Sequence, residues 1–167
     1  MRTHCENCGT PYPDAGGPWP RTCAACGHTR YLNPTPVAVL LQPVRHSAGE
    51  LGLLAIRRAI EPRKGLLALP GGFIDLGESW TSAAARELYE ETGVRIEEGR
   101  IVPFDVRSAP DSTVLIFGLA PPLAEGTLPP FTGTSETSAR TVLTAPRSLA
   151  FPLHTEVVAR WFEEREY

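Results

Sequence analysis

All four cysteines of this 167-residue chain lie within its first 26 residues, as two Cys-x2-Cys pairs. Cys5 pairs with Cys8 and Cys23 with Cys26; 14 residues separate the pairs, and a glycine follows each. Two such turns can present four thiolates in a tetrahedron about 2.3 Å from one zinc ion. Glycine suits the position after each pair because it tolerates the positive φ of a tight turn. We therefore expect a structural Zn²⁺ site, at a spacing just below the usual range of about 15–20 residues.

The short segment that contains the four cysteines cannot fold on hydrophobic burial alone, so the metal would have to stabilise it. Disulfides or a redox centre are the alternative uses of the cysteines. The longest aliphatic run, at 37–41, is far short of the roughly 20 residues of a membrane span, and no secretory signal opens the sequence. We expect a soluble protein of the cytoplasm, a compartment in which disulfides are rare. The prolines of the segment 33–36 suggest a hinge, and we expect a zinc ribbon at 1–32 and a second domain at 33–167.

The second domain alternates strand-like and helix-like patterns, which predicts an α/β fold with a mixed sheet covered on both faces. One helix is expected at 79–92, where Ser79 or Thr81 can cap the start and Gly93 stops the helix. A second amphipathic helix is expected at 153–164. Strands are expected at 37–44, 51–57, 66–70, 100–104, 113–119 and 141–143, with a long loop at 120–139.

Negative charge is concentrated in one part of a chain whose net charge is only −3. The segment 71–98 holds seven acids and two arginines. In the expected helix Glu87, Glu90 and Glu91 sit at i, i+3 and i+4, so their side chains share one face. A solvated acidic face is the common reading of such a pattern. The alternative is a bound divalent cation, for which oxygen ligands favour Mg²⁺ or Mn²⁺.

The spacing around these glutamates decides between the two readings. From Gly72 to Val94 the sequence reads Gly-x5-Glu-x7-Arg-Glu-U-x-Glu-Glu-x-Gly-U, where U is a bulky apolar residue. This pattern is the Nudix box, and the preceding segment 68–72 also resembles that family. The chain therefore resembles a Nudix hydrolase that carries a zinc ribbon. The resemblance implies a Nudix α-β-α sandwich with a mixed β-sheet and hydrolysis of a nucleoside diphosphate linked to another moiety.

The resemblance also assigns roles to single residues. It implies that Mg²⁺ is ligated by Glu87, Glu90, Glu91 and the backbone carbonyl of Gly71. Arg86 would hold the glutamates in register by ion pairing, and Glu78 would complete that network.

The catalytic base differs among Nudix enzymes and need not lie in the box. Some Nudix enzymes take the base from a later loop, and Glu136 is placed about right for this role; Glu125 and Asp111 are competitors. For substrate binding we expect Gly72, Arg57 and Arg58.

The substrate is expected to be ADP-ribose or another ADP-sugar, because ADP-ribose-cleaving members carry a proline about 16 residues beyond the box, where this chain has Pro110. NADH or another dinucleotide, and an oxidised nucleoside triphosphate, are alternatives. NADH-cleaving members have a Ser-Gln-Pro-Trp-Pro-Phe-Pro-like array after the box, which differs from Phe-Asp-Val-Arg-Ser-Ala-Pro at 104–110. A non-catalytic nucleotide sensor that uses the zinc ribbon for contacts is a third alternative. We expect a nucleotide-type small-molecule substrate and, by resemblance, a homodimer; the net charge gives no reason to expect nucleic acid or a membrane as a partner.

Overall fold

The computed structural model describes residues 3–14 and 16–165. The chain divides into two compact units, Met1–Pro34 and Thr35–Tyr167. Within the described residues no helix is both long and apolar enough to cross a membrane.

Two similar turns organise the first unit. In one, the Gly9 N–H donates to the Cys5 carbonyl at 2.9 Å, and in the other the Gly27 N–H donates to the Cys23 carbonyl at 2.8 Å. Both glycines have positive φ, at 73° and 72°, so a side chain at either position would be strained. A short hairpin, β1 (Arg21–Thr22) with β2 (Thr29–Arg30), supports the second turn.

The second unit contains two mixed sheets. The four-stranded sheet has the order β7-β3-β9-β8 and the five-stranded sheet the order β10-β4-β5-β11, with β6 paired to β5. The strands are β3 (Thr35–Leu41), β4 (Pro43–Arg45), β5 (Leu51–Arg58), β6 (Leu67–Ala68), β7 (Gly71–Phe73), β8 (Val102–Ser108), β9 (Thr113–Leu119), β10 (Leu123–Ala124) and β11 (Thr137–Leu143). The helices are α1 (Trp80–Thr92) and α2 (Pro152–Glu164), with 3-10 turns η1 (Glu98–Arg100) and η2 (Glu125–Thr127).

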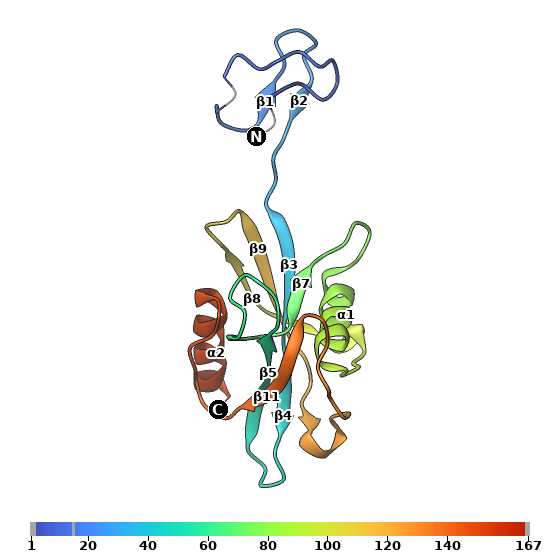
Figure 1. Cartoon of the computed structure of the whole chain (residues 1–167), viewed down its shortest axis with the longest axis vertical. Helices are drawn as coiled ribbons and strands as arrows, with labels where there is room; N and C mark the ends of the chain where they lie inside the picture. The colour runs from blue at the N-terminus through green and yellow to red at the C-terminus, as the bar shows by residue number, and fades with distance from the viewer. Residues whose placement is uncertain (1–2, 15, 166–167) are drawn as a thin grey trace. The chain divides into compact units, whose positions relative to one another are not determined.

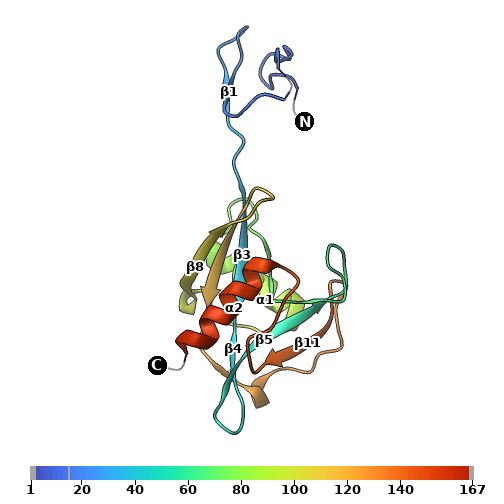
Figure 2. The ribbon, with the colours of Figure 1, turned by 90° about the vertical axis from the view of Figure 1, so that its left-hand side faces the viewer.

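The central strand β3 contributes to two hydrophobic cores. Val39 and Leu41 pack in the core that includes the apolar face of α2, and Ala38 and Leu40 pack in the core that includes α1. Because alternate residues of a strand point to opposite faces, both faces of β3 are buried. The helices accordingly lie on opposite sides of the sheets (Figure 1), and α2 crosses them in the orthogonal view (Figure 2). The expected α-β-α arrangement with mixed strand pairing is confirmed.

The single strand expected at 37–44 is wrong, because the chain changes sheets at Gln42. Before Gln42 the chain pairs with β9, and after it the chain pairs with β5 and β10. The Gln42 side chain is buried and donates at 2.9 Å to the carbonyls of both Pro43 and Pro121. An amide at this position therefore links the crossing point to the distant segment before β10.

Two other expected strands are misplaced. Residues 98–100 form η1, and the strand expected at 100–104 is β8, whose register shifts between Pro103 and Asp105. The strand expected at 141–143 begins at Thr137, inside the expected loop 120–139, which also contains β10 and η2. Most of β11 is polar and at least partly exposed, so no hydrophobic alternation marks its first half.

Candidate active site

Helix α1 carries the acidic face, and local sequence signals set its ends. The Ser79 hydroxyl accepts from the Ser82 N–H at 3.0 Å, and Gly93 ends the helix in the left-handed conformation with its N–H on the Tyr89 carbonyl. Ala84 and Leu88 are completely buried against β3 and its neighbours. This packing fixes the rotation of the helix and turns the glutamates toward the strand β7.

A single guanidinium connects the carboxylates. Arg86 binds both oxygens of Glu78, with Nε to Oε1 at 2.9 Å and Nη2 to Oε2 at 3.0 Å. Its Nη1 reaches Glu87 at 2.8 Å and Glu90 at 3.2 Å, and its Nη2 donates to the Phe73 carbonyl at 3.0 Å. Hydrogen bonding to Arg86 is the main cause of the lowered pKa of Glu78. The guanidinium therefore fixes three carboxylates of α1 and its preceding loop to the end of β7.

Glu91 is in a different environment from the other glutamates. It is only 5% exposed, and its Oε2 accepts a hydrogen bond of 3.0 Å from the Gly71 N–H. Burial raises the pKa of Glu91 to about 8, and the charge of Glu87 contributes in the same direction. Burial likewise raises the pKa of Glu87, against the opposing effect of Arg86. Arg86 is paired with Glu87, but among the described residues no ion pair neutralises Glu91, and a divalent cation beside the two carboxylates would relieve that condition.

The glycines beside this pair allow β7 to approach the helix. Gly71 is opposite Val39 and Gly72 opposite Ala38 in the pairing of β7 with β3. A Cβ on Gly72 would overlap the Glu87 carboxylate, and one on Gly71 would overlap the Ala38 carbonyl. The space that these glycines leave, together with an all-oxygen donor set, fits Mg²⁺ or Mn²⁺. The residues that would hold the ion are Glu87, Glu90, Glu91 and the Gly71 carbonyl.

Gly72→Ala is expected to weaken Mg²⁺ binding about tenfold with little change in the melting temperature. The added methyl group displaces the Glu87 carboxylate, a flexible side chain, and does not disturb a packed core. Isothermal titration with Mg²⁺ measures the affinity, and Gly99→Ala, which meets no atom within 4 Å, is the matched control. Equal Mg²⁺ affinity in the two variants would contradict the placement of the ion beside Gly72.

Glu136 is exposed and approaches the pair from the segment before β11. Its negative charge is one of the causes that raise the pKa of both Glu87 and Glu91. Its backbone carbonyl accepts from the Ala59 N–H at 2.7 Å, which ties its loop to the end of β5. The two competitors are engaged elsewhere: Glu125 pairs with His46 at 2.8 Å, and Asp111 accepts from Thr113 in the turn before β9.

The two arginines expected at the substrate differ in position. Arg57 donates to the Gly65 carbonyl at 2.6 Å and thus faces the loop after β5. Arg58 donates to the Pro62 carbonyl at 2.8 Å and lies 5.2 Å from the centre of the Phe151 ring. The charge of Arg58 lowers the pKa of Glu91, so this arginine faces the acidic pair more directly than Arg57 does.

One supporting residue gave no signal in the sequence. His154 of α2 is buried between the rings of Phe117 and Phe151, and its Nδ1 accepts from the Leu69 N–H at 3.3 Å. Burial lowers the pKa of His154 to about 3, so the ring is neutral and can accept this bond. The imidazole therefore holds the backbone two residues before Gly71. A lone histidine in an amphipathic helix does not reveal such a role.

The four cysteines form a compact group in the first unit. Their Sγ atoms all lie within 4.8 Å of one another, and none forms a disulfide. The Sγ atoms of Cys5 and Cys26 are 3.7 Å apart, as are those of Cys8 and Cys23. In a tetrahedron with zinc–sulfur bonds of about 2.3 Å, neighbouring sulfurs are about 3.8 Å apart. The thiol group could thus hold a metal ion, and its geometry fits zinc.

Comparison with known proteins agrees with this fold. Residues 34–163 match the family model of the NUDIX domain. The chain therefore belongs to the Nudix family. Among curated proteins, the NAD-capped RNA hydrolase NudC of Edwardsiella ictaluri is 28% identical over 114 residues, which cover 68% of this chain and 42% of that protein. The corresponding NudC of Citrobacter koseri is 30% identical over 107 residues, with 57% of this chain and 42% of that protein covered. This chain thus spans less than half the length of these relatives.

Solved structures extend the similarity to nearly the whole chain. A NUDIX hydrolase from Nitrosomonas europaea has a TM-score of 0.71 and 28% identity, and the match covers 98% of this chain and 92% of that chain. The NUDIX domain of Shewanella oneidensis NrtR, solved with ADP ribose, has a TM-score of 0.66 at 22% identity and covers 82% of this chain and 91% of that chain. At that identity the second likeness shows the fold alone.

Proposed function

We propose that the chain hydrolyses a nucleoside diphosphate linked to another moiety in the presence of Mg²⁺, with ADP-ribose or an ADP-sugar as the substrate. The observation that carries this proposal is the placement of Glu91, which is buried and accepts from the Gly71 N–H, beside Glu87, which Arg86 holds. When bound, Mg²⁺ would neutralise the diphosphate and favour attack of water on phosphorus. Arg86 and Glu78 would act as positioning residues, because their contacts are with other protein groups.

Glu136 is the residue that we propose as general base or as a further metal ligand. It is exposed, so its carboxylate can reach a water molecule, and its charge acts on Glu87 and Glu91. Arg58 and Gly72 would contact the substrate at the two sides of the acidic pair. The cysteine group would bind Zn²⁺ in a structural role, since four thiolates leave no open position for a substrate.

The proposal is tested by incubating the protein with Mg²⁺ and ADP-ribose, NADH, diadenosine polyphosphates, deoxynucleoside triphosphates and UDP-sugars. AMP release from ADP-ribose is expected, and Glu136→Gln is expected to slow it about 10²–10⁴-fold, the usual contribution of a general base. The matched control is Glu125→Gln, which removes the same charge at a carboxylate engaged with His46. No turnover of any substrate would reject the enzyme and favour a nucleotide sensor.

A dinucleotide substrate is the second candidate, and a specific similarity favours it. The curated relatives named above are NAD-capped RNA hydrolases. Faster release of AMP from NADH than from ADP-ribose in the same assay would establish this second substrate and reject the first.

A further inference from the structure

Positively charged residues are concentrated at the C-terminal end of β5. The last two residues of β5 and the loop after it contain Arg57, Arg58, Arg63 and Lys64, with Glu61 as the one acid. This concentration occurs in a chain whose net charge is −3. The whole-chain charge therefore conceals a strongly basic local surface.

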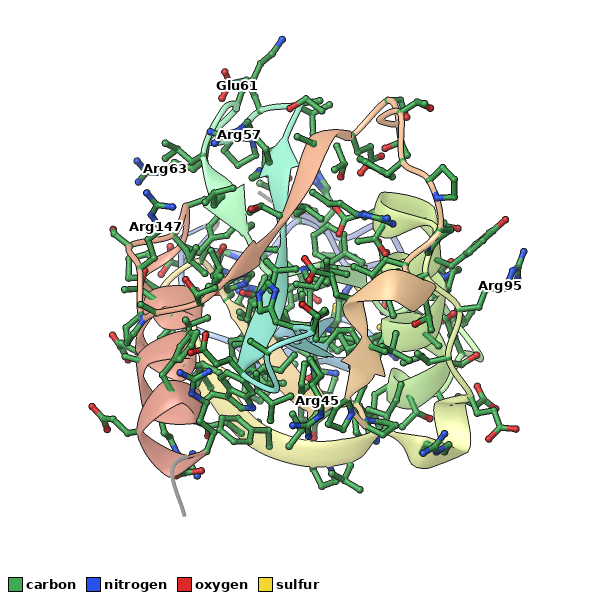
Figure 3. The ribbon with its side chains drawn as sticks, turned by 90° about the horizontal axis from the view of Figure 1, so that it is seen from below. Arg45, Arg57, Glu61, Arg63, Arg95 and Arg147 are labelled. Atoms are coloured by element: carbon green, nitrogen blue, oxygen red, sulfur yellow. The ribbon has the colours of Figure 1, made fainter. Side chains whose placement is uncertain are left out.

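The loop before α2 adds a further arginine to this surface. The Ala150 N–H of that loop donates to the Leu67 carbonyl at 2.7 Å, so the loop before α2 is bonded to β6, the strand that follows the basic loop. In the view of Figure 3 the labelled side chains of Arg57, Arg63 and Arg147 lie toward the same side of the molecule. Arg45 and Arg95 lie at other sides of the molecule in the same view. We call Arg57, Arg63, Lys64 and Arg147 the basic cluster.

The charges of the basic cluster are not neutralised by the protein. All four side chains are exposed, and among the described residues no ion pair joins any of them to a carboxylate. Arg63 also has a φ of 67°, a left-handed conformation that few residues other than glycine adopt. Arg63 lies in a tight turn, in which the Leu66 N–H donates to the Arg63 carbonyl at 3.2 Å.

The basic cluster adjoins the acidic site. The Ala59 N–H, at the start of the basic loop, donates to the Glu136 carbonyl at 2.7 Å. In the pairing of β5 with β11, Arg58 is opposite Thr137, the residue after Glu136. A ligand whose diphosphate lies at Glu87 and Glu91 can therefore extend past Glu136 or Arg58 onto the basic cluster.

We infer that the basic cluster binds phosphate groups that the substrate carries beyond the diphosphate that is cleaved, an inference that rests on the proposed function. Bound Mg²⁺ would meet the charge of the diphosphate itself, and an uncharged sugar calls for no cation. Each guanidinium group can donate two parallel hydrogen bonds to the oxygens of a phosphate. The additional phosphates would belong either to a nucleotide chain or to a single terminal phosphate on the leaving group.

Two anionic probes test this inference without any turnover. A fluorescent single-stranded RNA of 12 nucleotides is titrated with the protein in a chelator-free buffer without Mg²⁺, and inorganic tripolyphosphate competes for the same site. The double variant Arg63→Gln/Arg147→Gln is expected to bind the RNA about tenfold more weakly. The slope of log affinity against log salt should fall by about 1.4, because two phosphate contacts of a single strand are lost. Tripolyphosphate binding without RNA binding would assign the basic cluster to a terminal phosphate.

The matched control is Arg45→Gln/Arg95→Gln, which changes the net charge equally at other sides of the molecule. This control should bind both probes as the original chain does. Arg63→Lys/Arg147→Lys should recover most of the salt slope but less of the affinity, because lysine keeps the charge without the paired donors. Equal losses in the control, or no binding of either probe by the original chain, would overturn the inference. Probe binding without hydrolysis would reject the proposed function alone, and hydrolysis without probe binding would reject this inference alone.

Discussion

Glu91→Gln is expected to reduce hydrolysis roughly 10³-fold and at the same time to raise the melting temperature of the metal-free protein. The loss of activity follows from removing one of the carboxylates proposed to hold Mg²⁺. The gain in stability follows from burial, because a carboxylate that is 5% exposed has a pKa of about 8 without a cation. Glutamine carries no charge and can still accept the hydrogen bond from Gly71. A gain of about 2 kcal/mol would raise the melting temperature by roughly 4–8 °C.

The gain should depend on pH in a defined direction. The pKa of Glu91 in the folded protein lies above its ordinary value of 4.5, so the folded state keeps a proton that the unfolded chain releases. The original chain therefore has its full stability below about pH 4.5 and loses stability as the pH rises toward about 8. Glu91→Gln removes this loss. The difference in the free energy of unfolding between the two proteins, measured by urea titration, should grow between about pH 5 and pH 8.

Glu97→Gln is the control for this experiment. It removes the same charge from an exposed position before η1, where the side chain makes no capping hydrogen bond. Its activity and its stability at each pH should match those of the original chain. A stability difference for Glu91→Gln that stays constant over this pH range would show that the buried carboxylate is not the cause.

Removal of zinc is expected to unfold the first unit and leave the second unit folded. Among the described residues of the first unit, the core consists of Cys5, Tyr12 and Cys23, so the folding free energy must come largely from metal binding. The second unit has two cores of its own on the faces of β3. A chelator should abolish the chemical-shift dispersion of the amide NMR signals from the residues before Thr35. Added zinc should restore that dispersion. Metal analysis should find about one zinc ion per chain.

Cys26→Ser and Ala25→Ser form a matched pair for this experiment, because both residues are exposed in the same turn and only one is a thiol. Cys26→Ser should lose zinc and the dispersed signals, whereas Ala25→Ser should keep both. Dispersed signals from the first unit in reduced, zinc-free protein would contradict the zinc assignment.

Local signals made the acidic helix predictable. Ser79 and Gly93 define its ends within the chain itself, and the bonds of the caps span at most four residues. The convergence of Glu87, Glu90 and Glu91 follows from helical spacing alone. The position of Arg86 among these carboxylates follows in the same way, although its bonds to Glu78 and Phe73 depend on the fold of the preceding loop.

Contacts between distant residues decided what the sequence could not show. The division of the strand at Gln42 depends on a bond to Pro121, 79 positions away. The approach of Glu136 to the site depends on the bond between its carbonyl and Ala59. Thr137, Ser138 and Arg140 make the first half of β11 polar, so its pairing with β5 leaves no hydrophobic pattern to read. The basic cluster draws on two segments that are far apart in the chain. The net charge of the whole chain does not reveal it.

The bond between His154 and Leu69 makes α2 a support of the proposed active site, which lies on the opposite layer. Every residue of the 23-position motif lies before α2, yet the segment that presents Gly71 to Glu91 is anchored from α2. The geometry of the motif therefore depends on a residue outside the motif. A fragment that ends before Pro152 would contain the whole motif. It would still lack the hydrogen bond from α2 that supports the backbone leading to Gly71, whose N–H binds the buried Glu91.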